Sequence, residues 1–147
     1  MDKNLESPIS ASLEDYLEAI FWLVREQRVA RSKDIAERMG VTKSSVTGAL
    51  RQLTANGYIN YDPYSFVTLT ESGEELAEMI AHRHQVLADF LERVLGVEAS
   101  AADANACRME HAIDNDVLKR LIRFVKFLDS EQPDVRAWMQ AIEEKRP

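Results

Sequence analysis

The chain has 147 residues, a formal net charge of −7, 46% hydrophobic residues and one cysteine. These numbers exclude a disordered chain, because so many apolar side chains can build a core, and a single cysteine excludes an internal disulfide. No apolar run approaches the roughly 18 residues that can span a membrane. The N-terminus also lacks the charged and apolar regions of a signal peptide, so we expect a cytoplasmic protein.

The charges are distributed unevenly along the chain. Between Arg25 and Tyr61, seven basic and three acidic residues give a charge of +4, which leaves −11 for the remainder. This asymmetry is typical of a DNA-binding module attached to an acidic partner module. Solvated helix faces would produce the same distribution, so charge alone decides little between the two interpretations.

Apolar spacing predicts two helices at the start of the chain. The first covers residues 12–25, with Ser12 as the residue that caps its N-terminus. The second is short and covers residues 31–39, and Gly40 ends it in a left-handed conformation. A short turn after Gly40 leads into the next predicted element.

A third helix and a hairpin follow. Thr42 is expected to cap a helix that runs to Thr54, and Asn56-Gly57 marks a tight turn. Residues 58–61 and 66–70 are rich in β-branched and aromatic side chains, which predicts two strands of a hairpin. Helix, turn, helix and hairpin in this order are typical of a winged helix-turn-helix.

The second half of the chain predicts helices only. A long helix from residue 72 to 95 ends at Gly96, and alanine-rich and apolar patterns predict two more over residues 100–113 and 117–128. A last, exposed helix is expected over residues 134–144. The pattern therefore indicates a mainly α-helical protein whose hairpin forms a wing.

The third helix is the expected recognition helix for the major groove of DNA. Its first turns carry short hydroxyl side chains, which allow close approach, and its positive N-terminal end favours phosphate. The candidate DNA-binding residues are Arg31, Lys33, Thr42, Lys43, Ser44, Ser45, Thr47 and Arg51. The hydroxyl groups could instead merely cap the helix, and winged helices also serve as protein-interaction modules.

A possible metal site is marked by Cys107, Glu110 and His111, which share one face if their segment is helical. Thiolate, carboxylate and imidazole are all ligands for divalent transition metals. On the long helix, His84 lies on the apolar side, whereas His82 points away and is expected to be exposed. Each piece alone is weak, since a lone cysteine is more often a core residue and a lone histidine is seldom a ligand.

The chain also resembles the diphtheria-toxin-repressor and manganese-transport-regulator family of metal-dependent repressors, from about Leu13 to Leu128. The matching motifs are Leu13-Glu14-Asp15-Tyr16-Leu17-Glu18, Asp34-Ile35-Ala36-Glu37, Ser44-Ser45-Val46-Thr47, Leu69-Thr70-Glu71-Ser72-Gly73, Arg83-His84 and Cys107-Arg108-Met109-Glu110-His111. Several independent motifs in the right order make the resemblance specific.

The resemblance implies an N-terminal winged helix-turn-helix DNA-binding domain over residues 1–71. An α-helical dimerisation and metal-binding domain would follow over residues 72–147, with no SH3-like third domain. The implied metal ligands are Asp15, Glu18, His84, Cys107, Glu110 and His111. Such a protein would be a homodimer that binds a palindromic operator in double-stranded DNA and represses metal-uptake genes when Mn²⁺ or Fe²⁺ is plentiful.

The sequence departs from both branches of this family. Manganese-type members carry a carboxylate at the position of Cys107, and iron-type members carry methionine at the position of Asp15. Ala88 and Asp103 also stand where the iron branch has ancillary glutamate and histidine ligands. Carboxylates and imidazole suit Mn²⁺ or Fe²⁺, whereas a thiolate favours later metals, so Zn²⁺ binding in vitro is also expected.

Other functions stay open from the sequence alone. Asp15 and Glu18 could simply be favourable charges in the first turn of a helix. The protein could respond to a small organic ligand, or to oxidation of Cys107. An enzyme is not expected, because the sequence offers no nucleophile and base arrangement and no glycine-rich phosphate loop.

Overall fold

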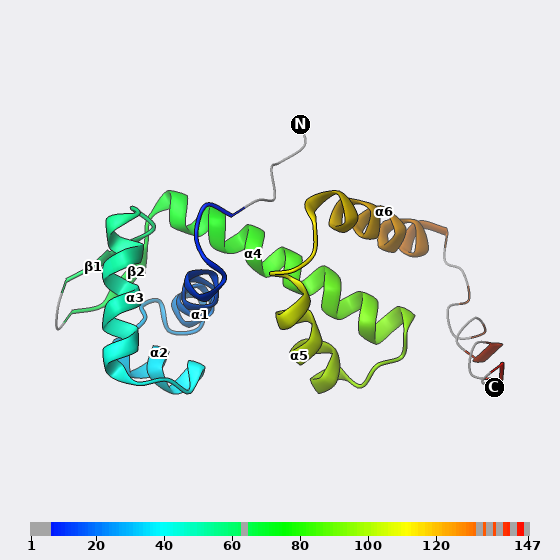
Figure 1. The fold of residues 1–147 in the computed structure, drawn as a ribbon, viewed down its shortest axis with the longest axis horizontal. Helices are drawn as coiled ribbons and strands as arrows, with labels where there is room; N and C mark the ends of the chain where they lie inside the picture. The colour runs from blue at the N-terminus through cyan, green and yellow to red at the C-terminus, as the bar shows by residue number, and fades with distance from the viewer. Residues whose placement is uncertain are drawn as a thin grey trace. The chain divides into compact units, whose positions relative to one another are not determined.

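The computed structural model describes residues 7–62 and 65–131, with six isolated positions beyond them (134, 137, 140, 141, 144 and 145). The chain divides into two compact units, Glu6–Ala81 and His82–Pro147, so that one long helix contributes to both (Figure 1). No described helix is both long and apolar enough to cross a membrane. The domain boundary expected at residue 71 precedes this division and stays a prediction.

The first unit contains three helices, a hairpin and the start of the long helix α4. These elements are α1 (Ala11–Gln27), α2 (Ser32–Met39), α3 (Lys43–Ala55), β1 (Ile59–Tyr61), β2 (Val67–Leu69) and α4 (Glu71–Asp89). Their order is the one that the sequence predicts for a winged helix-turn-helix, which confirms the predicted fold class for this part of the chain.

The helix ends follow from local chemistry, with one correction. Ser10, not Ser12, caps α1, because the Ser10 hydroxyl accepts a hydrogen bond from the Leu13 amide at 3.3 Å. Gly40 ends α2 with φ of 65°, as predicted. Thr42 caps α3 by accepting from the Ser45 amide, also as predicted. These caps define the short turn between α2 and α3.

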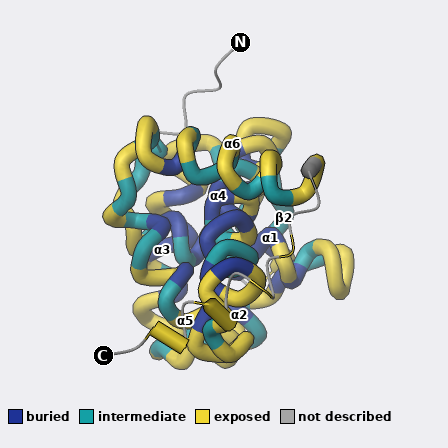
Figure 2. The backbone as a smooth tube through the Cα atoms, turned by 90° about the vertical axis from the view of Figure 1, so that its right-hand side faces the viewer, coloured by how far each residue is buried: buried dark blue, intermediate teal, exposed yellow. Residues whose placement is uncertain are grey.

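The core of the first unit joins α1, α2, α3, the hairpin and α4 (Figure 2). Leu17 and Ile20 of α1, Ile35 of α2, and Leu50 and Leu53 of α3 have no exposed surface. Burying each such side chain stabilises the fold by about 1.5–3 kcal/mol. The interlocking apolar stripes therefore hold α3 in a fixed orientation within its unit.

The wing is tied to this core by the strands and by one glycine. Ile59 pairs with Leu69 and Tyr61 with Val67, while Val67 also exchanges two backbone hydrogen bonds with Ala30. Gly73 is required at the start of α4, because a Cβ there would lie 1.8 Å from the Tyr58 carbonyl oxygen. Residues 63–64, between the two predicted strands, lie outside the described residues.

The second unit contains the end of α4 and the helices that follow it. These elements are the π-helical segment η1 (Phe90–Val94), α5 (Ala99–Met109) and α6 (Asn115–Glu131). The predicted long helix thus changes to π geometry near its end, a change that is frequent at functional sites. Gly96, with φ of 68°, stops it as predicted.

The helix predicted over residues 100–113 is shorter than expected. α5 ends at Met109, Glu110 occupies the C-cap position, and His111 lies in the following turn. The prediction of one helical face for Cys107, Glu110 and His111 is therefore wrong for His111. The last predicted helix, over residues 134–144, lies largely outside the described residues.

Candidate DNA-binding groove and metal centre

A surface groove of about 880 Å³ lies among α2, α3 and the wing of the first unit. Its lining includes four basic residues and no acidic one, and it contains five of the eight predicted DNA-binding residues. The lining residues are Arg31, Ser32, Lys33, Lys43, Thr47, Arg51, Thr54, Ala55, Tyr61, Ser65 and Phe66. A groove with only positive charges attracts a polyanion such as the phosphate backbone.

The cations of this groove differ from Arg25 and Arg38, two other basic residues of the first unit. Within the described part of the chain, Arg38 pairs with Glu26 at 3.0 Å and Arg25 pairs with Glu78 at 2.9 Å. No described salt bridge involves Lys43 or any other groove cation. The positive charge that remains uncompensated is thus concentrated beside the recognition helix.

The predicted hydroxyl residues divide into two groups. Thr42, Ser44 and Ser45 are exposed and bond to one another, with Oγ distances from Thr42 of 2.9 and 3.0 Å. The Thr47 hydroxyl lines the groove but donates to the Lys43 carbonyl at 2.9 Å. These hydroxyl groups therefore also stabilise the first turns of α3, as the capping interpretation requires.

The sequence prediction missed two aromatic residues of the groove. The Arg31 guanidinium lies 5.0 Å from the ring centre of Phe66, a cation–π contact, and Tyr61 is the second aromatic residue of the lining. Half of the Phe66 surface is exposed. Strand alternation could have revealed it, because the next residue, Val67, is buried and an aromatic neighbour must then face outward.

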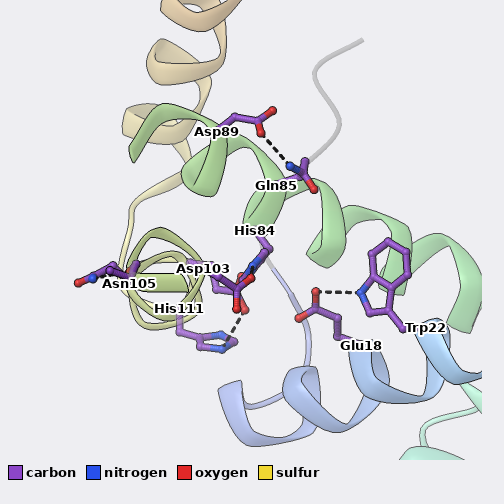
Figure 3. Close-up of polar contacts among 10 residues, drawn as sticks. Glu18, Trp22, His84, Gln85, Asp89, Asp103, Asn105 and His111 are labelled. Carbon is purple, nitrogen blue, oxygen red and sulfur yellow. Dashed lines mark hydrogen bonds and ion pairs between the residues drawn. The ribbon is translucent and has the colours of Figure 1, made fainter. Parts of the chain in front are cut away.

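The candidate metal centre in the second unit is built around a buried carboxylate. Glu110 is 1% exposed, and its Oε2 atom lies 2.9 Å from His84 Nδ1. His111 Nε2 lies 3.3 Å from the other oxygen, Oε1, which has no hydrogen-bond donor in the described structure (Figure 3). A buried carboxylate oxygen without a donor costs about 1–3 kcal/mol, so a cation bound at Oε1 would offset this cost.

Position along the helices explains this grouping. Cys107 and Glu110 follow each other at i and i+3 at the end of α5, and Glu110 keeps helical dihedral angles. The Cys107 sulfur lies within 4.8 Å of a Glu110 carboxylate oxygen. The tight turn after α5 brings His111 back to Glu110 although His111 is not helical.

The histidines of α4 lie as predicted. The His84 side chain is 17% exposed and turns toward Glu110, whereas His82 is exposed. The second ring nitrogen of His84, Nε2, contacts Asp103 Oδ1 at 2.8 Å (Figure 3). Asp103 is not among the ligands predicted from the sequence, where it stands only as a departure from the iron branch, so its contact with His84 was not predicted.

The donor atoms of the second unit fit a divalent cation. Two ligands about 2.1 Å from one metal and at right angles to each other lie about 3 Å apart. The nitrogen-to-oxygen distances of 2.9 and 3.3 Å around Glu110 match such an edge of a coordination sphere. Imidazole, carboxylate and thiolate are together suited to Mn²⁺, Fe²⁺ or Zn²⁺.

The remaining two predicted ligands, Asp15 and Glu18, belong to the first unit. Both are half-buried on α1, and Glu18 Oε1 accepts a hydrogen bond from Trp22 Nε1 at 3.4 Å (Figure 3). The prediction passed over Glu14, which is the buried carboxylate of this helix at 4% exposure. The grouping of all six ligands across the two units remains a prediction.

Two family profiles match the chain in succession. Residues 8–67 match the iron dependent repressor N-terminal DNA binding domain, and residues 70–136 match the iron dependent repressor metal binding and dimerisation domain. Together they cover the first unit with its basic groove and the second unit with its buried carboxylate.

Similar full-length proteins come from an archaeon and a bacterium. The chain is 38% identical over 123 residues to the uncharacterized HTH-type transcriptional regulator MJ0568 of Methanocaldococcus jannaschii, covering 82% of this chain and 98% of that protein. It is 34% identical over 130 residues to the HTH-type transcriptional regulator MntR of Lysinibacillus sphaericus, covering 88% and 92%. Almost the whole length of both relatives is thus matched.

Solved structures share the fold. A manganese-dependent transcriptional repressor in complex with manganese aligns with a TM-score of 0.70 at 32% identity, and T. acidophilum IdeR aligns with a TM-score of 0.70 at 26% identity. These alignments cover 77–78% of this chain, which spans about half the length of either solved protein, 53%. The chain therefore belongs to the iron-dependent repressor family of metal-dependent, DNA-binding transcriptional repressors.

Proposed function

We propose that the protein is a homodimeric repressor that binds a palindromic operator in response to intracellular Mn²⁺ or Fe²⁺. The proposed metal ligands are Asp15, Glu18, His84, Cys107, Glu110 and His111. The observation that carries the proposal is the buried Glu110 carboxylate between two imidazoles, with one oxygen that lacks a donor. A divalent cation bound there would supply the positive charge that this carboxylate lacks.

The residues of the chain have separate tasks in this mechanism. His84, Cys107, Glu110 and His111 form the part of the site that belongs to the second unit. Asp15 and Glu18 would bring α1 to the same ion and so connect the DNA-binding unit to it. Without the ion, three carboxylates repel one another, and the DNA-binding units should be mobile. Metal affinity that is about 100-fold higher in the DNA-competent form would shift this equilibrium by about 2.7 kcal/mol.

The DNA-binding step rests on the groove of the first unit. Lys43 and Arg51 of α3 and Lys33 of α2 would contact phosphates and set the register of the recognition helix. Thr42, Ser44, Ser45 and Thr47 allow the N-terminus of α3 to approach the major groove. Arg31, held against Phe66, would contact the DNA backbone beside the wing.

Dimerisation would place two such grooves on two half-sites. Exposed apolar side chains on α6 support a self-association surface in the second unit: Val117 is 52% exposed and Phe127 is 56% exposed. The match to a dimerisation domain supports the same assignment. The proposed domain boundary, at residues 71 and 72, coincides with the first turn of α4.

Mn²⁺ is the favoured signal in this proposal, ahead of Fe²⁺. The similar protein named MntR and the solved manganese complex support Mn²⁺, as do the carboxylates among the six ligands. Cys107 favours Fe²⁺ or Zn²⁺ instead. The proposed targets are metal-uptake genes that the protein represses in the cytoplasm when metal is plentiful.

The test is fluorescence anisotropy with DNA from the protein's own promoter region, under anaerobic conditions. After chelation, DNA binding should be weak. Mn²⁺ added at its physiological concentration should restore DNA binding more effectively than Zn²⁺ added at a trace concentration. Equal binding with and without chelator would overturn the metal-switch mechanism. If peroxide treatment weakens DNA binding of the wild type but not of Cys107→Ser, the result would favour the redox alternative.

A further inference from the structure

Both ring nitrogens of His84 are engaged by carboxylates of different kinds. Nδ1 lies 2.9 Å from Glu110 Oε2, and Nε2 lies 2.8 Å from Asp103 Oδ1. The Glu110 side chain has no exposed surface, whereas the Asp103 side chain is 74% exposed. The imidazole therefore has one nitrogen directed at the buried centre and the other directed at the protein surface.

Asp103 occupies the correct helical position for this contact. Asp103 and Cys107 of α5 and Glu110 at its C-cap follow one another at i, i+4 and i+7, which places them on one face because Glu110 keeps helical dihedral angles. His84 approaches this face from α4. Asp103 is thus one helical turn from the thiol and two turns from the buried carboxylate.

The torsion that orients a histidine ring has no strong intrinsic preference. A ring turned by half a rotation would direct a carbon atom where Nδ1 now lies. The hydrogen bond to Asp103 removes this freedom, because it requires Nε2 to carry a proton and to point outward. A neutral histidine with Nε2 protonated presents a lone pair on Nδ1, the nitrogen that lies 2.9 Å from Glu110 Oε2.

The geometry points to Asp103 as a positioning residue for the metal centre, which holds His84 so that it binds the cation through Nδ1. This inference rests on the proposed function, since it concerns the same ion. A carboxylate that holds the second nitrogen of a metal-binding histidine sets its tautomer and increases its basicity, and losing it typically weakens metal binding about 10–100-fold. Asp103 itself does not touch the ion.

The first test measures Mn²⁺ affinity and stoichiometry of the full-length protein by calorimetry. Asp103→Ala should bind the same number of Mn²⁺ ions about 10–100-fold more weakly. Asp103→Asn keeps an acceptor oxygen for Nε2–H and should lose much less, which separates orientation from loss of a nearby negative charge. Asp116→Ala is the matched control, because Asp116 has a similar side-chain exposure of 78% in the same unit and should bind Mn²⁺ like the wild type.

The second test reads the orientation directly. In the Zn²⁺-loaded, ¹⁵N-histidine-labelled protein, the His84 signals should show a protonated Nε2 and a metal-bound Nδ1. Asp103→Ala should broaden or divide these signals as the ring samples other orientations, while Asp103→Asn should retain them. A purely structural role for Asp103 would not change the tautomer of one histidine.

Three results would overturn the inference alone. They are unchanged Mn²⁺ affinity in Asp103→Ala, a Zn²⁺-bound Nε2 in the wild type, and the loss of one Mn²⁺ equivalent in Asp103→Ala, which would make Asp103 a ligand of a second cation. Wild-type protein that binds neither Mn²⁺ nor Zn²⁺ would instead overturn the proposed function and this inference with it.

Discussion

The two units of this protein use charge in opposite ways. In the first unit, Lys43, Arg51 and the other groove cations are exposed and have no acidic partner among the described residues. In the second, the Glu110 carboxylate is buried and held by two imidazoles at defined distances. Exposed cations act together through a summed electrostatic field that salt screens. A buried charged group acts through contacts at fixed distances, and few other residues can replace it there. Sensitivity to single mutations should therefore differ strongly between the units.

The largest effect is expected at Glu110. Glu110→Gln keeps the size of the side chain but removes the charge at the centre of the proposed site, so Mn²⁺ binding should weaken by more than about 100-fold, beyond the loss expected for a supporting residue. Metal-dependent operator binding should be lost, as measured by anisotropy. The unfolding temperature of the metal-free variant should not be lower than that of the metal-free wild type, because a buried charge has been removed. Glu92→Gln, an exposed residue of the same unit, is the control.

A groove cation should have an intermediate effect that depends on salt. Arg51→Ala should weaken binding to specific and unrelated DNA alike and should reduce the slope of log affinity against log salt by about 1. Arg38→Ala is the matched control, since Arg38 pairs with Glu26 and does not line the groove. Equal losses in both variants would contradict the assignment of the groove as the DNA-binding surface.

A smaller effect is expected for the wing aromatic that holds Arg31. Phe66→Leu keeps an apolar side chain but removes the ring under the guanidinium, which should weaken operator binding about two- to fivefold. Phe66→Tyr preserves the ring and should bind nearly as the wild type does. If Phe66→Leu and Phe66→Tyr bind equally well, the cation–π contact plays no part in DNA binding.

The smallest effect is expected at the start of α5, the helix that carries Cys107 and Glu110. Hydrogen bonds from the Ser100 hydroxyl, then from the Ser100 and Ala101 amides, hold the pKa of Glu98 below its ordinary value. A lowered folded pKa means that the ionised cap stabilises the helix above the ordinary pKa and that this stability is lost as pH falls through the lower value. Glu98→Ala should slightly lower the melting temperature of the metal-free protein at pH 7.

This difference in melting temperature between wild type and Glu98→Ala should shrink as the pH falls below 4.5, the ordinary pKa of the carboxyl group, and through the lower folded pKa. A pH-independent difference would mean that Glu98 stabilises α5 through contacts other than its ionised carboxylate. The melting temperatures of both proteins can be measured by circular dichroism from pH 7 down to acidic pH. The prediction also sharpens the comparison of the units, because an exposed carboxylate at a helix end should matter far less than the buried Glu110.

Most of the fold could be predicted because its signals are local. The αL glycine at Gly40, the Thr42 cap and the buried stripe of Val46 and Leu50 all depend on residues within a few positions of one another. The cap at Ser10 was placed two residues late, since both Ser10 and Ser12 satisfy the same local rule. Such end positions are decided by packing rather than by residue type.

The residue types of the candidate metal centre were likewise evident from the sequence. The i, i+3 spacing of Cys107 and Glu110 identified the end of α5, and the inward side of α4 identified His84 over His82. The sequence did not show that α5 ends at Met109, because the alanine-rich pattern continues beyond it. It therefore placed His111 on the wrong element while choosing a residue that does contact Glu110.

Local sequence patterns set the order of the elements, the basic character of α3 and the kinds of donor atom at the candidate metal centre. Which of these donors meet depends on the packing of the elements. His84 contacts Asp103 and Glu110, which lie 19 and 26 residues away, and Phe66 of the wing reaches Arg31 before α2. Periodicity and caps are set by neighbours along the chain, whereas these contacts depend on how helices and strands pack across long separations.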